Sequence, residues 1–409
     1  MAAASRNPFY FKSLLRRRIE MFTSNRKPRA ARWAGGIIGT TAVTLTIALA
    51  YGAEQSMRKD EIQPVNPGTA VVDPAIQKIA EAALGEAIKT HKAKGGFAIV
   101  AEPSSGKILA VANIDTTNKM SGRWALSQLL EPASIAKTLV VAQAIESGLT
   151  TPQEKHSCEN GNYRYGSRVY HDWKPEGWNQ LTTEETIAHS GTICTIKIAE
   201  KVSGDGLVKM LKDFGFGPEG TAKNFPEART GVLPPLGNPY YPDVVPAVSA
   251  GFGFKITPIE LVQAYGAIAN GGSLMNPLPA NADSSEIQAI RRVLSSQNAA
   301  KVKDILRQVV LKGTGQGTAS SNLYSTAGKT ASSHIPDLAK ADGKKIGNFA
   351  GFIGFAPVNE PKVEVYVGIF APGAGATPAH GSSHAAPVFK RIAEDVLKHW
   401  KVAPDQPQS

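Results

Sequence analysis

Two kinds of apolar pattern alternate along residues 74–400 and restrict the chain to few fold classes. Between about residues 130 and 315, apolar positions recur every three to four residues, which predicts helices. The helical segments are Ile135–Ser147, Thr183–Val202, Gly206–Phe214, Pro258–Asn270 and Ala299–Leu311. On both sides of this region, short apolar runs bounded by turn residues predict strands. These runs are Phe97–Ala101, Ile108–Val111, Asn348–Phe355 and Val363–Phe370. This order predicts an α+β fold in which both ends of the chain build one sheet around a helical insertion.

The distribution of charge excludes one class of function. The chain of 409 residues has a formal net charge of +11, and residues 1–32 hold nine Lys or Arg against a single acidic residue, Glu20. That tail therefore accounts for eight of the net positive charges, and the rest of the chain carries only +3. We expect no nucleic-acid partner, because the folded part lacks the excess of basic residues that such a surface needs.

An uncharged segment of 21 residues, Trp33–Ala53, follows the basic tail and ends at Glu54. A helix of this length spans roughly the 30 Å hydrocarbon core of a bilayer. The basic residues before it predict a cytoplasmic N-terminus. We therefore expect a single-pass signal anchor in the bacterial inner membrane, with the residues after 54 on the periplasmic or extracytoplasmic side. A cleaved signal peptide and a buried core helix are the alternatives.

The chain is predicted to contain one large folded domain. We divide it into a basic cytoplasmic tail (1–32), a transmembrane anchor (33–53), a linker (54–73), the domain (74–400) and a C-terminal tail (401–409). The linker contains two prolines and lacks periodicity. The domain is expected to open with a helix at Pro74 that ends before Gly95, and to close with a helix from Pro387 to Trp400.

Cysteine and histidine positions give little indication of a cofactor. The chain has two cysteines, Cys158 and Cys194, which the expected topology places in an oxidising compartment. A disulfide and two buried thiols both remain open interpretations. His380 and His384 are four residues apart, but they lie in a glycine-rich stretch that is not expected to be helical. We predict no metal site and no cofactor.

A serine and a lysine at the start of the helix after residue 134 form a candidate catalytic pair. Ser134 and Lys137 are three residues apart, so a helix places both on one face, where the amine can take the hydroxyl proton. The same S-x-x-K spacing occurs at Ser24, Ser56 and Ser104. Only Ser134 begins an apolar helix, so it can point into a cleft with its backbone N–H free to bind an oxyanion.

Around this pair the sequence resembles the penicillin-binding proteins, particularly the class B peptidoglycan D,D-transpeptidases. The resemblance covers roughly residues 70–398 and depends on several motifs that follow in the family's order. They are Glu131–Lys137, Tyr170–Trp173 before Thr186–Ser190, Gly251–Pro258, Ala264–Gly272, Ala327–Thr330 and Phe352–Pro357. It implies an antiparallel sheet flanked by helices with a helical subdomain, as in serine β-lactamases. We interpret the aromatic residues Tyr170, Trp173, Phe252 and Phe254 as packing residues.

The family's second motif, S-x-N, corresponds to Ser190-Gly191-Thr192, in which threonine replaces asparagine. Ser190 keeps the hydroxyl that would relay a proton to the leaving amine. Thr192 has one hydroxyl where asparagine has an amide donor and a carbonyl acceptor, so one contact to substrate or lysine is expected to be lost or mediated by water. Ser203-Gly204-Asp205 is a weaker candidate for the same motif.

The third motif, K-T-G, corresponds to Lys329-Thr330-Ala331, followed by Ser332. The resemblance implies that Lys329 and Thr330 hold the substrate carboxylate and that the N–H of Ser332 completes the oxyanion hole. Alanine at 331 replaces a glycine that allows close backbone approach, so we expect its methyl group to obstruct the substrate.

These motifs together imply a serine acyl-transfer enzyme. Lys137 would act as general base for Ser134, and β-lactams would mimic the stem-peptide donor. Members of class B usually carry a pedestal domain between anchor and catalytic domain, and here only residues 54–73 stand there. A membrane glycosyltransferase or proteins of the division or elongation machinery are the partners that the resemblance implies. The alternatives are a D,D-carboxypeptidase, a serine β-lactamase and a non-catalytic protein of wall assembly.

Overall fold

The computed structural model describes residues 71–117, 123–218, 222, 224–234, 243–334, 348–370 and 379–407. The expected cytoplasmic tail, the anchor and most of the linker lie outside these residues. Within the described part of the chain, no helix combines the length and the apolar character needed to cross a bilayer. The boundaries predicted for residues 1–73 therefore stay predictions.

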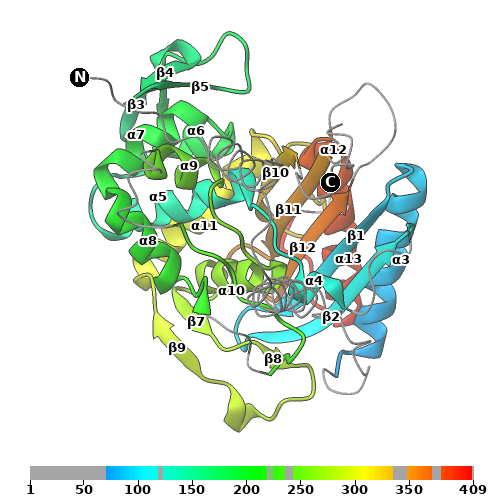
Figure 1. Cartoon of the computed structure of the whole chain (residues 1–409). Helices are drawn as coiled ribbons and strands as arrows, with labels where there is room; N and C mark the ends of the chain where they lie inside the picture. The colour runs from blue at the N-terminus through cyan, green and yellow to red at the C-terminus, as the bar shows by residue number, and fades with distance from the viewer. Residues whose placement is uncertain are drawn as a thin grey trace, which may run out of the picture. The chain divides into compact units, whose positions relative to one another are not determined.

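Six strands form the main sheet of the domain, in the order β10-β11-β12-β1-β2-β8 (Figure 1). The neighbouring strands are antiparallel except β2 and β8, which are parallel. Both ends of the chain build the sheet, as expected, and β10 lies at one edge of it. The strands are β1 (Gly95–Glu102), β2 (Lys107–Asp115), β8 (Leu278–Pro279), β10 (Ala327–His334), β11 (Asn348–Ala356) and β12 (Val363–Phe370).

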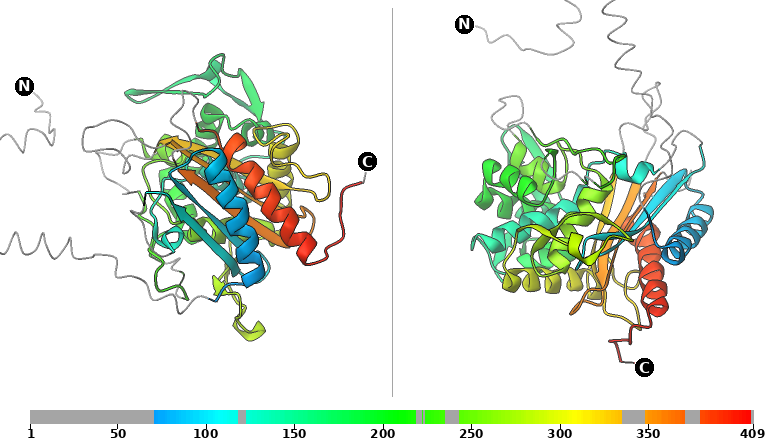
Figure 2. Two further views of the ribbon diagram at one scale, coloured as in Figure 1. Left: turned by 90° about the vertical axis from the view of Figure 1, so that its right-hand side faces the viewer. Right: turned by 90° about the horizontal axis from the view of Figure 1, so that it is seen from below.

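Two long helices cover one face of this sheet, namely α3 (Pro74–Thr90) and α13 (Ala386–His399) (Figure 2). Asp73 caps α3 by accepting hydrogen bonds from the backbone N–H groups of Ala75 and Ile76, and Pro74 occupies its first position. Leu84 of α3 and Phe389 of α13 belong to the same buried cluster as the strand residues that face them. The N-terminal helix begins at Pro74, as predicted, and ends four residues earlier than its expected limit at Lys94.

The opposite face of the sheet packs against a helical lobe (Figure 2). Its central helices are α5 (Ala136–Glu146) and α10 (Pro258–Ala269), and α10 is buried on every side. The remaining helices of the lobe are α4 (Trp124–Ser127), α6 (Thr183–Ala188), α7 (Thr192–Val202), α8 (Gly204–Asp213), α9 (Val244–Ala250) and α11 (Ser296–Leu311). A sheet with both faces covered needs apolar residues on both sides of each strand, which explains the continuous apolar runs of the sequence.

The single helix predicted over Thr183–Val202 is wrong, because the chain forms two helices there. Ser190 has a φ of 58°, a left-handed conformation that interrupts an α-helix. Gly191 then becomes the N-cap residue of α7. The break has a functional consequence, because Ser190 and Gly191 belong to the second motif.

Three short two-stranded sheets occupy regions that were expected to be loops. They pair β3 (Lys155–Ser157) with β6 (Gln180–Thr182), β4 (Asn162–Tyr165) with β5 (Arg168–His171), and β7 (Ser273–Met275) with β9 (Ala289–Arg292). The stretch from His380 to His384 is also not irregular, because Gly381–His384 form the short helix α12. Strands of three or four residues contain too few alternations for sequence periodicity to detect.

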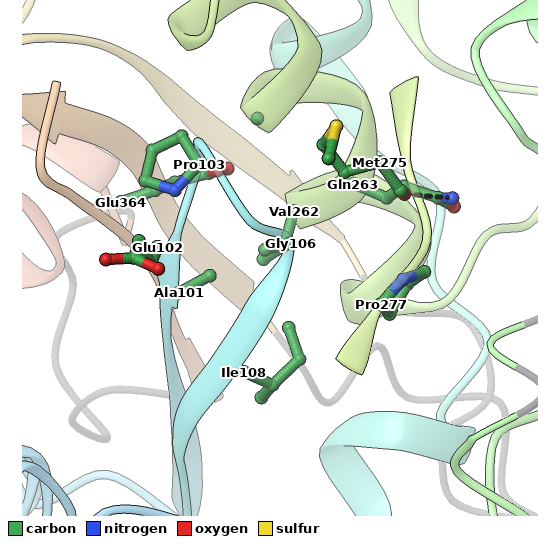
Figure 3. A pocket seen from close by; sticks show the side chains of 11 residues that line it. Ala101, Glu102, Pro103, Gly106, Ile108, Val262, Gln263, Met275, Pro277 and Glu364 are labelled. Atoms are coloured by element: carbon green, nitrogen blue, oxygen red, sulfur yellow. Dashed lines mark hydrogen bonds between the residues drawn. The ribbon is translucent and has the colours of Figure 1, made fainter. Parts of the chain in front are cut away.

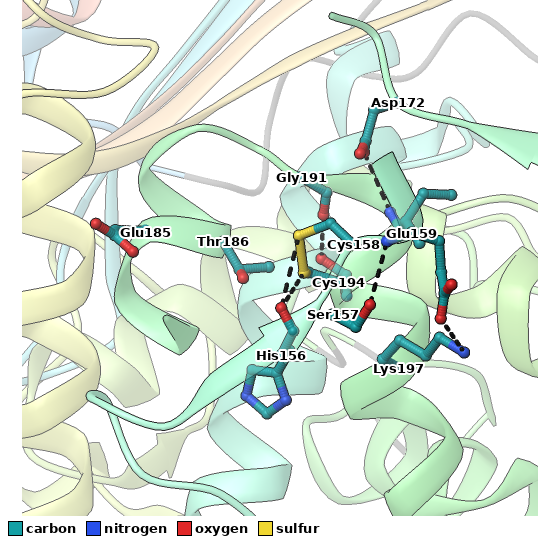
Figure 4. Close-up of a disulfide and its surroundings, with 12 residues drawn as sticks. His156, Ser157, Cys158, Glu159, Asp172, Glu185, Thr186, Gly191, Cys194 and Lys197 are labelled. Carbon is teal, nitrogen blue, oxygen red and sulfur yellow. Dashed lines mark hydrogen bonds and ion pairs between the residues drawn. A yellow bond between two sulfur atoms is a disulfide. The ribbon is translucent and has the colours of Figure 1, made fainter. Parts of the chain in front are cut away.

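Cys158 and Cys194 form a disulfide between the loop after β3 and the first turn of α7 (Figure 4). This resolves the open choice between a disulfide and two thiols. Both residues are fully buried, and they are 36 positions apart in the sequence. The bond therefore links the helix that follows the second motif to a loop of the lobe that is far from it in the sequence.

Replacing both cysteines by alanine should lower the free energy of unfolding by about 3–4 kcal/mol, because the loop that the bond closes is then free in the unfolded chain. Equilibrium denaturation with urea measures this difference. The wild-type chain in reductant should lose a similar amount, and equal stabilities in oxidising and reducing buffer would contradict the prediction.

Glu364 is a carboxyl group in the interior of the domain. Its side chain is 1% exposed, and neither oxygen meets a donor of the described residues. It lies on β12 beside a small cavity under the turn between β1 and β2 (Figure 3). Gly266 of α10 leaves room for it, since a Cβ there would lie 3.0 Å from Oε2. Burial raises the pKa of Glu364 well above its usual value.

Glu364 should make the fold less stable as pH rises. The pKa of such a carboxyl is higher in the folded than in the unfolded state. Its contribution to the free energy of unfolding is therefore fully present at a pH below its unfolded pKa. That contribution falls by up to about 1.4 kcal/mol per pH unit until the folded pKa is passed. Glu364→Gln should remove this loss in denaturation curves between about pH 5 and 9, whereas Glu360→Gln, an exposed change in the turn before β12, should keep it. A parallel pH dependence in Glu364→Gln and wild type would show that the carboxyl is not the cause.

Candidate active site

Ser134 lies in a one-turn 3-10 helix, Ala133–Ile135, that leads directly into α5. The turn is held from two sides. On one side, Gly251 accepts a hydrogen bond from the N–H of Ala133 at 3.1 Å, and a Cβ at 251 would come within 1.9 Å of the Ala133 oxygen. On the other side, the hydroxyl of Tyr265 donates to the carbonyl of Ile135 at 2.9 Å. Both contacts come from motifs that the resemblance singled out, and their role is to hold the backbone around Ser134.

Lys137 is buried one helical turn after Ser134, and only 2% of its side chain is exposed. Its amine donates to the carbonyl of Ser190 at 2.7 Å and to the hydroxyl of Thr192 at 3.0 Å. The hydroxyl of Ser190 is 3.5 Å away. Burial lowers the pKa of Lys137 to about 8, although the charge of Asp172 opposes this shift. A lysine with this pKa is partly neutral near neutral pH and can accept a proton.

Thr192 compensates for the asparagine that the second motif lacks. Its hydroxyl contacts the amine of Lys137 directly, so of the two contacts considered, to substrate and to lysine, the one to lysine is present. The left-handed backbone of Ser190 turns its carbonyl toward the same amine. Ser203, the first residue of the alternative motif, has a structural role instead. It caps α8 by accepting a hydrogen bond from the N–H of Gly206. The structure thus brings Ser190 and Thr192, and not Ser203, to Lys137.

The third motif lies on β10, the edge strand of the main sheet. Thr330 and Ser332, two residues apart, both line the cleft that contains Ser134. Lys329 is fully buried, and its amine donates to the carbonyl of Thr330 at 3.1 Å. Burial, and after it the charge of Lys137, lower the pKa of Lys329 well below its usual value. The positive charges of Lys137 and Lys329 therefore repel one another behind the cleft. This repulsion disfavours the state in which both amines are protonated.

Ala331 does not obstruct the cleft, contrary to our expectation. Its side chain is 1% exposed and belongs to the apolar core between sheet and lobe. The paired residue on β11 is Gly351, which supplies the space that the methyl group fills. Gly381 of α12 also approaches this strand closely, since a Cβ at 381 would lie 2.6 Å from the Ala331 oxygen. Neighbouring glycines thus accommodate the alanine where the family has glycine.

A cleft of about 410 Å³ contains the predicted nucleophile. Its walls are Ser134, Trp173, Ser190, Thr314, Thr330, Ser332, His380, Gly381 and Ser382. The three motifs predict that Ser134, Ser190, Thr330 and Ser332 lie at one site, and the structure brings all four together. Lys137, Thr192, Lys329 and Ala331 lie behind this wall. The cleft is large enough for a peptide terminus or a bicyclic ligand of similar size.

Several cleft residues were not predicted. Trp173 was interpreted as a packing residue, but 62% of it is exposed, and its indole N–H donates to the carbonyl of His189. Thr314 contacts the hydroxyl of Thr330 at 2.7 Å. Tryptophan beside a known motif and the glycine-rich stretch that follows Lys312 are the sequence signals that could have indicated these positions.

A family model described as the penicillin binding protein transpeptidase domain matches residues 96–394. Among curated proteins, stage V sporulation protein D of Bacillus subtilis is 27% identical over 387 residues, which cover 88% of this chain and 58% of that protein. "Probable peptidoglycan D,D-transpeptidase PenA" of Neisseria gonorrhoeae is 27% identical over 351 residues, 82% of this chain and 57% of that protein. The chain thus spans less than two thirds of the length of these relatives.

Two solved structures have a fold similar to that of this chain. The transpeptidase domain of penicillin-binding protein 3 from Burkholderia pseudomallei, in its apo form, has a TM-score of 0.73 and 26% sequence identity. The match covers 84% of this chain and all of that chain. A second structure, titled a peptidoglycan glycosyltransferase from Burkholderia ambifaria, has a TM-score of 0.72, 28% identity and 83% coverage of this chain.

Proposed function

The chain belongs to the penicillin-binding protein transpeptidase family, and from this premise we propose that it is a D,D-transpeptidase that crosslinks peptidoglycan stem peptides through a serine acyl-enzyme. One observation carries the proposal. The amine of Lys137 is buried, its pKa is lowered to about 8, and it is held by Ser190 and Thr192 directly behind a cleft that contains Ser134. A buried amine with a lowered pKa is costly to keep at a site that has lost its chemistry, which argues against a degenerate member of the family.

In the first half-reaction, Lys137 takes the proton of the Ser134 hydroxyl. The serine oxygen attacks the carbonyl between the two terminal D-alanines of a stem peptide. The backbone N–H groups of Ser134 and Ser332 stabilise the negative charge on the carbonyl oxygen. Ser190 passes the proton to the departing D-alanine, whose carboxylate binds at Thr330, and the amine of Lys329 holds the carbonyl of Thr330 from behind.

In the second half-reaction, an amine from a neighbouring stem peptide attacks the acyl-enzyme. The same groups work in reverse, so that Ser134 recovers its proton and the two peptides are joined. A β-lactam enters as a mimic of the donor peptide and stops at the acyl stage. Exclusion of water from the acyl-enzyme distinguishes this outcome from hydrolysis.

We also propose that residues 33–53 anchor the chain in the bacterial inner membrane with the domain outside the cytoplasm. The support is the 21-residue uncharged segment after a basic tail. A membrane glycosyltransferase or proteins of the division or elongation machinery are the proposed partners. Fractionation of cells tests whether the chain is bound to the membrane. Alkaline phosphatase fused after residue 54 tests the topology, because the fusion should be active outside the cytoplasm, and an inactive fusion would contradict the proposal.

The full chain, purified in detergent and incubated with fluorescent penicillin, tests the proposed activity. We expect a long-lived adduct, which peptide mass spectrometry locates on Ser134. With synthetic stem peptide and an acceptor amine, the main product should be the crosslinked dimer. Rapid release of penicillin would indicate a β-lactamase instead, and release of D-alanine without a dimer would indicate a D,D-carboxypeptidase. Absence of any acylation by penicillin or stem peptide would leave the non-catalytic role in wall assembly.

A further inference from the structure

Asp172 is a buried carboxylate at the point where β5 ends, 18 residues before the second motif. Its side chain is 8% exposed, and its N–H donates to the carbonyl of Gly161 at 3.1 Å. It lies in the stretch Tyr170–Trp173 but is not one of the site residues that the S-x-x-K, S-x-N and K-T-G motifs predict. The residue nevertheless contacts the second motif directly, as its hydrogen bonds show.

The first carboxylate oxygen of Asp172 holds the start of α7 (Figure 4). Oδ1 accepts the backbone N–H of Thr192 at 2.6 Å and that of Ile193 at 3.2 Å. The N-cap residue of α7 is Gly191, which has no side chain to satisfy these N–H groups. A carboxylate from a different segment therefore supplies the cap, and it also adds negative charge at the positive end of the helix.

The second carboxylate oxygen of Asp172 is buried and meets no hydrogen-bond donor among the described residues. An aspartate needed only as a cap would cost less with its second oxygen in solvent, because a buried unpaired charge is unfavourable. Its cationic neighbour is Lys137, which feels the Asp172 charge at its amine. The arrangement keeps a negative charge close to Lys137 while leaving the amine bonded to Ser190 and Thr192.

Thr192 joins the two groups. Its backbone N–H donates to Asp172, and its hydroxyl contacts the amine of Lys137. A shift of the α7 start would therefore move the hydroxyl that holds the lysine. The charge of Asp172 stabilises the protonated form of Lys137, and the charge of Lys137 in turn lowers the pKa of Lys329 on β10. The disulfide at Cys194 fastens the same first turn of α7 to the lobe.

We propose that Asp172 is a positioning residue of the active site, which sets the start of α7 so that Ser190 and Thr192 hold Lys137 and which balances the charge of that amine. This inference rests on the proposed function, because the consequence of good positioning is fast acylation of Ser134.

Two substitutions separate the cap from the charge. Asp172→Asn keeps an oxygen acceptor for the two N–H groups but removes the charge, so the pKa of Lys137 should fall. The rise of the acylation rate with pH should then occur at lower pH than in the wild type. The maximal rate reached at high pH should change little. Asp172→Ala removes the cap as well, and the acylation rate constant at saturating penicillin should fall about 10- to 100-fold, with little change in the penicillin concentration giving half the maximal rate.

Asp73 provides a matched control. It caps α3 through the same pair of hydrogen bonds, to Ala75 and Ile76, but on the far face of the sheet. Asp73→Asn and Asp73→Ala should reduce stability by amounts similar to the Asp172 variants, roughly 0.5–2 kcal/mol for the alanines. They should leave the acylation rate and its pH profile unchanged. If the Asp172 variants also affect stability alone, the residue is only a cap and the proposal is overturned.

A measurement without catalysis separates this proposal from the proposed function. The chain labelled with 13C at lysine Cε gives an NMR titration of Lys137, assigned by its absence in Lys137→Met. Asp172→Asn should lower the pKa read from this signal, and Asp73→Asn should not. If neither penicillin nor stem peptide acylates the wild-type chain, the proposed function is wrong, but an altered Lys137 titration still supports the positioning role. An unaltered titration overturns that role whatever the activity.

Discussion

A chain with Ser134→Ala should form no covalent adduct with penicillin and should produce no crosslinked stem peptide. The hydroxyl oxygen of Ser134 is the atom that becomes acylated in the proposed reaction, and alanine leaves no atom to replace it. Loss of a nucleophile of this kind lowers turnover by about 10⁶ where it has been removed from a serine hydrolase, so the residual rate falls below detection. Gel fluorescence after labelling and intact-protein mass spectrometry both measure the adduct.

Ser104 offers a control with the same S-x-x-K spacing. It precedes Lys107 by three residues but lies in the turn between β1 and β2, away from the cleft. Ser104→Ala should therefore label like the wild type. The serine at 134 is half-buried and contributes little packing volume, so its replacement should leave the thermal unfolding curve nearly unchanged. An adduct that persists in Ser134→Ala would show that the nucleophile has been placed wrongly.

Replacement of Lys137 by methionine should lower the acylation rate by about 10²- to 10⁴-fold, the usual contribution of a general base. Methionine has a similar shape, and the site is buried, so the variant should fold. In the wild type, the pKa of about 8 predicts that acylation speeds up as pH rises toward 8 and levels off above it, because the neutral amine is the active form. The methionine variant should lack this rise. Stopped-flow or quench measurements from about pH 6 to 10 test both statements.

Lys303 serves as the control for a partly buried lysine outside the cleft. Burial lowers its pKa too, and its amine donates to the carbonyl of Asn359. Lys303→Met should acylate at the wild-type rate with the same pH profile. A Lys137→Met chain that keeps more than a tenth of the wild-type rate would mean that another group accepts the proton of Ser134. Lys329 would then be the first group to test, because its pKa is also lowered by burial.

Local information in the chain was enough to predict most of the longer helices and strands of the domain. Helices α5, α8, α10, α11 and α13 and strands β1, β2, β11 and β12 all lie at their predicted positions to within a few residues. The reason is that a covered sheet and a helical lobe impose periods of two and 3.6 on the apolar positions, and these periods can be read directly. The prediction failed where one residue controls the backbone, as at Ser190, or where a strand is too short to show a period.

Some residues of the cleft could be predicted from local spacing in the sequence, and others could not. Ser134 and Lys137 could be paired from the sequence, since three positions in a helix bring two side chains onto one face. Trp173, Thr314 and His380 could not, because they reach the cleft from loops whose course depends on contacts far along the chain. The disulfide between Cys158 and Cys194 belongs to this second group, as does Asp172 with its hydrogen bonds to α7.

The chemical identity of the residues, their order and the short spacings between them were thus determined by the sequence alone. Only the tertiary structure decided where the two departures from the family motifs lie and what they contact. Thr192 keeps its contact because the left-handed turn at Ser190 and the cap from Asp172 bring its hydroxyl to Lys137. Ala331 leaves the cleft open because its methyl group fills the space beside Gly351. The physical reason is that burial, and with it the lowered pKa of Lys137, arises from atoms brought together by packing, which no short stretch of sequence specifies.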